Sequence, residues 1–67
     1  MKTLNIVTRK ARDNFNEYVV VDRGQAYENE RRYVSATANR ISIAGGEWFW
    51  GHYFCTLDQA VEHFNGR

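Results

Sequence analysis

The chain has 67 residues, of which 43% are hydrophobic, 15% aromatic and 25% charged, with a formal net charge of +1 at pH 7. A chain of this length buries about 60% of the surface that its unfolded form exposes, so we expect one small domain, residues 1–67, with no room for a large substrate cleft. The composition excludes a disordered chain, and the charge balance argues against a dedicated nucleic-acid binder, which usually carries a basic excess.

Cysteine content and hydropathy indicate the cytoplasm. Cys55 is the only cysteine, so no internal disulfide can form, whereas small secreted domains usually carry several. No stretch approaches the roughly 20 apolar residues of a membrane span. We therefore expect a cytoplasmic protein that does not associate with a membrane.

The charges are distributed unevenly along the chain. Residues 1–40 hold eight bases and five acids, a net +3, whereas residues 41–67 hold one base and three acids, a net −2. The first twelve residues contain four bases and no acid: Lys2, Arg9, Lys10 and Arg12. This basic edge is expected either to steer an acidic partner or simply to be solvated.

The first half of the chain predicts two strands. Residues 3–8 are rich in β-branched residues and read as a strand, and the polar residues 9–16 suit a turn. Residues 17–22 read as a second strand, whose three consecutive valines indicate a central position covered on both faces. Residues 25–38 are ambiguous between a helix and a loop over 24–30 followed by a strand from about Arg31.

The pair Gly45-Gly46 separates two runs with alternating character, 40–44 and 47–54, and predicts a two-residue β-hairpin. The period of two then assigns the side chains to two faces. One face is expected to carry Ile41, Ile43, Trp48, Trp50, His52 and Phe54. The other face is expected to carry Arg40, Ser42, Phe49 and Tyr53.

A C-terminal helix is predicted after Thr56, which suits an N-cap and is followed three residues later by Gln59. An apolar stripe follows at helical spacing: Leu57, Ala60, Val61 and Phe64. We expect this stripe to cover the hairpin face that holds Ile41, Ile43, Trp48 and Trp50. The expected fold class is α+β: a small antiparallel sheet of three to five strands, with a C-terminal amphipathic helix packed on one face.

No residue pattern predicts catalysis, a metal site or a cofactor. His52, Cys55 and His63 have the spacing H-x2-C-x7-H, which lacks the paired spacing and ligand number of zinc sites. His63 is expected to point to solvent, and a single cysteine at a strand end is usually a small buried hydrophobe. The sequence therefore predicts a protein that is not an enzyme.

The predicted binding site uses the hairpin face opposite the helix. Phe49, Tyr53 and Arg40 are of the residue types enriched at protein-binding hot spots, and Arg9, Lys10 and Arg12 would adjust the contact. The same aromatics suit base stacking in a single-stranded nucleic acid. A third alternative is that residues 25–38 or a second copy of the chain, in a homodimer, covers them.

Residues 51–65, a strand ending in an aromatic followed by Thr56 and an Ala-containing helix, resemble the end of plant ethylene-response-type DNA-binding domains and of phage integrase arm-binding domains. That resemblance implies a DNA-reading sheet, but residues 41–55 contain no Lys or Arg. In size and layout the chain resembles the small inhibitors encoded by phages and mobile elements, including anti-CRISPR proteins. This second resemblance implies a protein partner, a host complex that handles nucleic acid.

Overall fold

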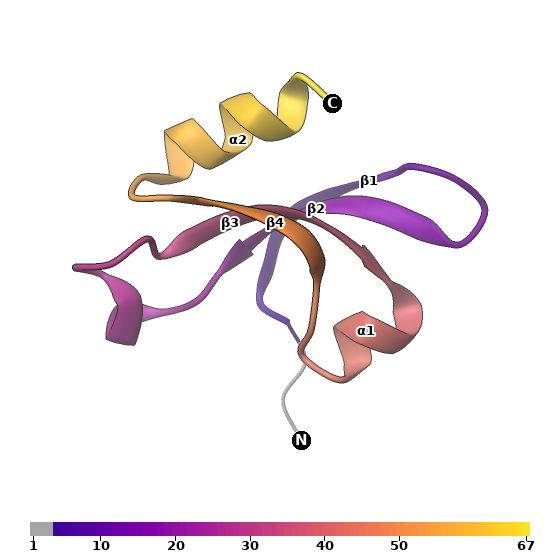
Figure 1. The fold of residues 1–67 in the computed structure, drawn as a ribbon, viewed down its shortest axis with the longest axis horizontal. Coiled ribbons are helices and arrows are strands. Elements are labelled where there is room, and N and C mark those ends of the chain that lie inside the picture. The colour runs from indigo at the N-terminus through magenta and orange to yellow at the C-terminus, as the bar shows by residue number, and fades with distance from the viewer. Residues whose placement is uncertain (1–3) are drawn as a thin grey trace.

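The computed structural model describes residues 4–67, which form a four-stranded antiparallel sheet in the order β1-β2-β3-β4. Helix α2 lies over one face of the sheet, and the short helix α1 lies on the opposite side (Figure 1). The predicted α+β fold with a C-terminal helix on one face is confirmed. In chain order the elements are β1 (Ile6–Ala11), β2 (Asn16–Asp22), the 3-10 helix η1 (Gln25–Tyr27), β3 (Tyr33–Asn39), α1 (Arg40–Ala44), β4 (Phe49–Phe54) and α2 (Leu57–Asn65).

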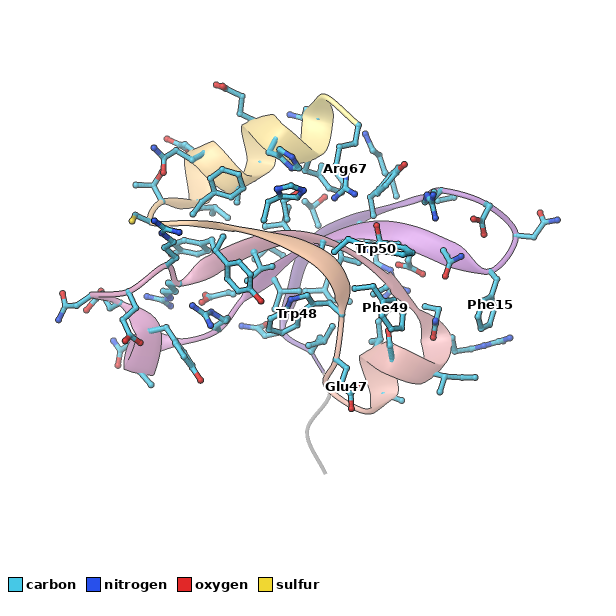
Figure 2. All side chains as sticks on the ribbon, in the orientation of Figure 1. Phe15, Glu47, Trp48, Phe49, Trp50 and Arg67 are labelled. Carbon is cyan, nitrogen blue, oxygen red and sulfur yellow. The ribbon has the colours of Figure 1, made fainter. Side chains whose placement is uncertain are left out.

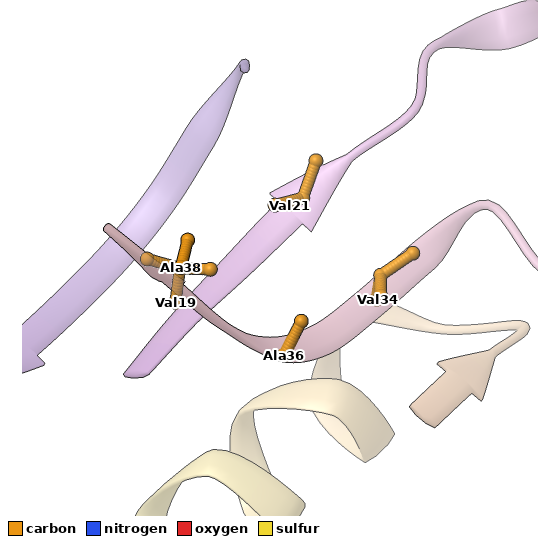
Figure 3. Close-up of a cluster of buried hydrophobic side chains, with 5 residues drawn as sticks. All are labelled: Val19, Val21, Val34, Ala36 and Ala38. Atoms are coloured by element: carbon orange, nitrogen blue, oxygen red, sulfur yellow. The ribbon is translucent and has the colours of Figure 1, made fainter. Parts of the chain in front are cut away.

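The three valines of β2 lie at the centre of the fold, as predicted. Val19 and Val20 are 0% exposed and Val21 is 2% exposed, because β2 pairs with a strand on each side and both of its faces are covered. Val19 and Val21 join a cluster on the α1 side that is drawn in Figure 3, together with Val34, Ala36 and Ala38. Val20 packs on the other side against Ala60 and Phe64 of α2.

The first hairpin closes later than the sequence predicts. Strand β1 runs from Ile6 to Ala11 rather than over 3–8, and the prediction's first residue lies outside the described residues. The cause is the side chain of Asp13, which accepts hydrogen bonds from the backbone N–H groups of Phe15 and Asn16 at 2.9 and 2.8 Å. These two local hydrogen bonds fix the turn after Ala11. Arg9 and Lys10 therefore belong to a strand and point to opposite faces.

The predicted hairpin at Gly45-Gly46 is wrong, because residues 40–44 form helix α1. Asn39 accepts a hydrogen bond from the backbone N–H of Ser42 at 2.8 Å, and the Ser42 hydroxyl accepts one from the Asn39 N–H at 3.0 Å. This reciprocal capping box starts a helix where the alternation indicated a strand. Gly46 adopts a φ of 77°, as glycine commonly does just after a helix. The chain then returns as β4, which pairs with β3 instead of with 40–44.

Helix α2 begins as predicted, with the Thr56 hydroxyl accepting a hydrogen bond from the Gln59 N–H at 3.2 Å. The surface predicted beneath it is wrong. Ala60 and Phe64 pack on Val20, and the half-buried residues around them are Tyr18, Tyr33, Phe54 and Leu57. Of the four residues expected beneath the helix, Ile43 and Trp48 pack on the opposite face, and Ile41 and Trp50 are each 72% exposed.

Candidate interaction surface

The six residues predicted to bind a partner do not form one patch. Tyr53 lies where β4 approaches η1, with its hydroxyl accepting a hydrogen bond from Trp48 Nε1 at 3.2 Å and the Arg23 guanidinium 5.0 Å from its ring centre. Phe49 lies at the other end of β4. Tyr53 and Phe49 are 41% and 39% exposed, so both are accessible but in separate places.

Arg40 and Arg9 lie together, away from Tyr53. Arg40 is the first residue of α1 and lines a hollow of about 330 Å³ with Arg9, Asn14 and Phe15. Arg9 is already paired, since its Nη2 donates to Glu17 Oε2 at 2.8 Å. Its charge is therefore largely compensated within the sheet.

One group of exposed apolar side chains lies at the end of the sheet that holds the β1–β2 hairpin and α1, apart from Val7, Tyr27 and Tyr53, which are also exposed. It consists of four side chains, which we call the aromatic patch: Phe15 (50% exposed), Ile41 (72%), Phe49 (39%) and Trp50 (72%). Phe15, Ile41 and Phe49 line a hollow of about 390 Å³, and the Phe49 and Trp50 ring centres are 6.2 Å apart. Figure 2 shows Phe15, Phe49 and Trp50 near this end of the sheet.

Sequence reasoning found only Phe49 of this patch. The alternation of the sequence predicts Ile41 and Trp50 beneath α2, and the polar composition of residues 9–16 predicts a turn that includes Phe15. One signal was present: Phe15 is the only apolar residue between Arg12 and Glu17 in an otherwise polar segment. A large apolar side chain at a hairpin tip contributes little to a core, so its presence there favours a binding role.

Trp50 has an uncommon backbone conformation, with a φ of 50°. Strand β4 bulges at this point, because Ser35 pairs with His52 and Thr37 pairs with Phe49, which leaves two residues opposite Ala36. A left-handed conformation costs a residue other than glycine about 1–2 kcal/mol. The bulge breaks the alternation of β4 and turns the indole to solvent, where it buries little surface to offset that cost.

On the α2 side of Trp50, three cations surround the ring of Tyr18, and we call them the cationic cluster: Lys10, Arg12 and Arg67. The Lys10 ammonium and the Arg12 and Arg67 guanidinium carbons lie 5.9, 5.9 and 4.4 Å from the Tyr18 ring centre. Arg12 also lies 5.9 Å from the Trp50 ring, so Trp50 adjoins both the aromatic patch and the cationic cluster. Lys2, the fourth base of the predicted basic edge, lies outside the described residues.

The two histidine rings lie side by side, with His52 exposed and His63 half-buried, which corrects the expectation that His63 points to solvent. The rings of His52 and His63 are 4.5 Å apart, and His63 Nδ1 is 2.8 Å from the Ser35 hydroxyl. Burial lowers the pKa of His63, and the charges of His52 and Arg67 lower it further. Ser35 is fully buried, so the bond orients the His63 ring and does not present a nucleophile to solvent.

Cys55 is exposed rather than buried, and it carries no disulfide. Within residues 4–67, no three His, Cys, Asp or Glu side chains gather as a group that could hold a metal ion. No helix in the same range has the length and apolar character to cross a membrane. Comparison with known protein families, with curated proteins and with solved structures finds no match to this chain.

Proposed function

We propose that this chain is a non-enzymatic protein-binding module that docks through its aromatic patch. The partner in this proposal is a larger host complex that handles nucleic acid, the class implied by the resemblance to small phage-encoded inhibitors. The observation that carries the docking surface is Trp50, 72% exposed on a strained backbone. Strain of this kind persists where the surrounding structure imposes it and is concentrated at functional positions.

The composition of the patch supports a protein partner. Tryptophan and arginine are enriched among the residues that dominate binding energy, and aromatic residues in general are enriched at interfaces. Phe15 and Phe49 border a hollow that an apolar side chain of a partner would fill, next to the flat indole of Trp50. The patch draws residues from the β1–β2 hairpin, α1 and β4, so only the folded chain assembles it.

Nucleic-acid binding is the second candidate, and the cationic cluster beside Trp50 favours it. Proteins that bind single strands combine a positively charged groove with aromatic side chains on which bases stack. Affinity of that origin falls steeply as salt rises, because phosphate contacts release counterions. A protein partner held by the aromatic patch would tolerate salt better, since apolar burial is not screened.

The test is a tagged pull-down from bacterial lysate, with and without nuclease, followed by mass spectrometry. We expect a stoichiometric protein that survives nuclease and is lost from the double variant Phe49→Ala with Trp50→Ala. The matched control is Tyr27→Ala, since Tyr27 is 38% exposed, close to the 39% of Phe49, but belongs to η1 at the opposite end of the sheet (Figure 1).

Three outcomes would contradict the proposal. Capture that disappears with nuclease would support nucleic-acid binding instead. Capture unchanged in the folded double variant would show that the aromatic patch is not the docking surface. Empty beads in both arms, for a folded protein, would leave no protein partner in that lysate for the module to bind.

A further inference from the structure

The cationic cluster contains positive charge that the fold neutralises only in part, through the ion pair of Arg12 with Asp13. Its three members approach Tyr18 from different parts of the chain: Lys10 from β1, Arg12 from the first hairpin and Arg67 from two residues beyond the end of α2. Lys10 also lies 4.8 Å from the ring centre of Phe64, which is 5% exposed. The cations are therefore held in place by aromatic rings rather than by carboxylates.

Their hydrogen-bonding capacity is largely unused. Arg67 Nη2 donates to the Thr37 hydroxyl at 3.2 Å, whereas Arg67 Nη1 is buried and has no hydrogen-bond partner. Within the described residues, neither Lys10 nor Arg67 forms an ion pair. Arg67 is thus fixed beside Tyr18 with Nη1 shielded from solvent, whereas Arg12, whose side chain is 40% exposed, is open to an acceptor from outside the chain.

The acid that pairs with Arg12 is already engaged in the hairpin turn. Asp13 is 3.9 Å from Arg12 Nη1, but its carboxylate accepts the backbone N–H groups of Phe15 and Asn16 in the hairpin turn. Two arginines outside the cluster, Arg9 and Arg32, each donate hydrogen bonds to a carboxylate of the same chain. Arg32 donates two hydrogen bonds to Asp22, at 2.6 and 3.0 Å.

We propose that the cationic cluster binds carboxylates of an acidic segment of the partner protein, next to the place where an apolar side chain of that segment packs on Trp50. This inference rests on the proposed function and names the chemistry of the partner. Guanidinium groups bind carboxylates through two parallel hydrogen bonds, and the exposed guanidinium of Arg12 is open to such a contact. Lys10 and Arg67 add positive charge around the same Tyr18 ring.

A peptide is favoured over a nucleic-acid strand by the number and position of the aromatic rings. A single strand requires successive exposed rings along a basic groove. Here Trp50 is the only ring of the described residues that is both more than half exposed and adjacent to the cluster, and Phe49 faces the hollow lined by Ile41 and Phe15.

The test is an NMR titration of the ¹⁵N-labelled protein with two probes at low salt: poly-L-glutamate and a 12-nucleotide oligothymidylate. We expect poly-L-glutamate to shift the Trp50 indole N–H and the Tyr18, Thr37 and Arg67 amides. The triple variant Lys10→Gln, Arg12→Gln and Arg67→Gln should bind poly-L-glutamate about tenfold more weakly. This is the combined effect expected from the loss of three exposed or half-exposed ion pairs of ordinary strength. The charge-matched control is Arg23→Gln, Arg31→Gln and Arg40→Gln, for which less than about a twofold change is expected.

Because Lys10 and Arg67 pack on aromatic rings, the triple variant can lose stability. Arg12→Gln, at an exposed hairpin position, keeps the test decisive and should weaken poly-L-glutamate binding by about twofold. Oligothymidylate that binds more tightly than poly-L-glutamate, or shifts that do not fall on the cluster, would overturn the inference.

The failure of this inference is distinguishable from failure of the proposed function. Suppose that a lysate partner is lost with Phe49→Ala and Trp50→Ala but is retained by the triple variant. That result would support the aromatic patch as the docking surface and contradict the binding of an acidic segment by the cationic cluster. Poly-L-glutamate bound at the cluster, with no protein partner captured from lysate, would support the carboxylate site and contradict the protein-binding module.

Discussion

The imidazole rings of His52 in β4 and His63 in α2 lie 4.5 Å apart, where the helix meets the sheet. His63 is half-buried, and burial is the main cause of its lowered pKa, followed by the neighbouring His52 and Arg67. Protonating His63 would place a poorly hydrated positive charge beside Arg67 and a second titratable ring. The contact between α2 and the sheet is therefore sensitive to acid.

We expect the free energy of unfolding to fall as pH decreases below about 6.5, the ordinary pKa of histidine. The unfolded chain takes up a proton at His63 near that pH, whereas the folded chain resists until the pH passes its lower folded pKa. The stability is therefore present above 6.5 and is lost progressively below it. Urea unfolding at pH 7.5, 6.5 and 5.5 measures the slope.

The variant His63→Gln should flatten this dependence, and His52→Gln should reduce it, because one of the unfavourable neighbours is removed. Asp13 and Asp22 also have lowered pKa values, so their contributions are lost only below about 3.8, outside this window. An unchanged slope between pH 7.5 and 5.5 in His63→Gln would show that another group carries the acid sensitivity.

Gly51 is required by the packing of Trp48. A Cβ atom at this position would lie 2.7 Å from Trp48 Nε1 and 3.0 Å from Val34 Cγ1, closer than side-chain atoms normally approach. Gly51→Ala should therefore displace the indole, break its hydrogen bond to Tyr53 and destabilise the fold by about 1–3 kcal/mol. Chemical denaturation followed by tryptophan fluorescence measures both effects.

Gly45→Ala is the matched control for that substitution. A Cβ at Gly45 would meet only the Ile41 and Ser42 carbonyl oxygens at 3.6 and 3.7 Å, which is ordinary contact, and its φ is −88°. We expect no loss of stability, or a gain of a few tenths of a kcal/mol from reduced backbone entropy in the unfolded chain. Equal losses in the two variants would contradict a specific clash at Gly51.

The capping box at the start of α1 should be worth about 1 kcal/mol, the usual contribution of an N-cap side chain. We expect Asn39→Ala to lower the free energy of unfolding by this amount, because the Ser42 N–H loses its acceptor. The control is Asn14→Ala, since Asn14 is exposed in the first hairpin and its side chain makes no hydrogen bond within the described chain. Equal effects at the two positions would show that the cap does not hold α1.

Asn39 also explains why residues 40–44 were assigned to the wrong element. The alternation of Ile41 and Ile43 fits a strand, and five residues are too few for helical periodicity to appear. The two reciprocal hydrogen bonds between Asn39 and Ser42 start the helix instead, and this local polar pattern is masked by the apolar alternation. Where local and tertiary signals agree, as for the three valines of β2 and the stripe of α2, prediction from sequence succeeded.

The candidate site was predictable only in part. Phe49 and the bases of the first hairpin carried a compositional signal for binding, and the structure places them at accessible positions. The exposure of Trp50 follows from a bulge, which shifts every side chain beyond it in β4 relative to β3. The bulge contains Gly51, and a glycine inside a strand pattern is itself a signal for a bulge, but the apolar run around it favours reading the indole as a core residue.

The strain at Trp50 is measurable by comparing two substitutions at this position. In a strand, glycine is normally less stable than alanine by about 0.5–1 kcal/mol. At Trp50, with a φ of 50°, we expect the order to reverse, with Trp50→Gly more stable than Trp50→Ala by about 1 kcal/mol. Phe49, the neighbouring residue of β4, has no positive φ and should keep the normal order in the same pair of substitutions.

Both Trp50 variants remove the indole, so both should lose the partner captured by the wild-type chain, whatever their stability. A Trp50→Gly protein that is as stable as wild type and captures no partner would separate the two roles of this residue. The free-energy cost of the positive φ at Trp50 would then come from keeping an indole at this position. That is expected if the bulge serves binding rather than folding. Thermal unfolding of the four variants, with the pull-down on each, decides this. A normal Gly/Ala order at Trp50 would contradict the strain, and retained capture would contradict the role of the indole.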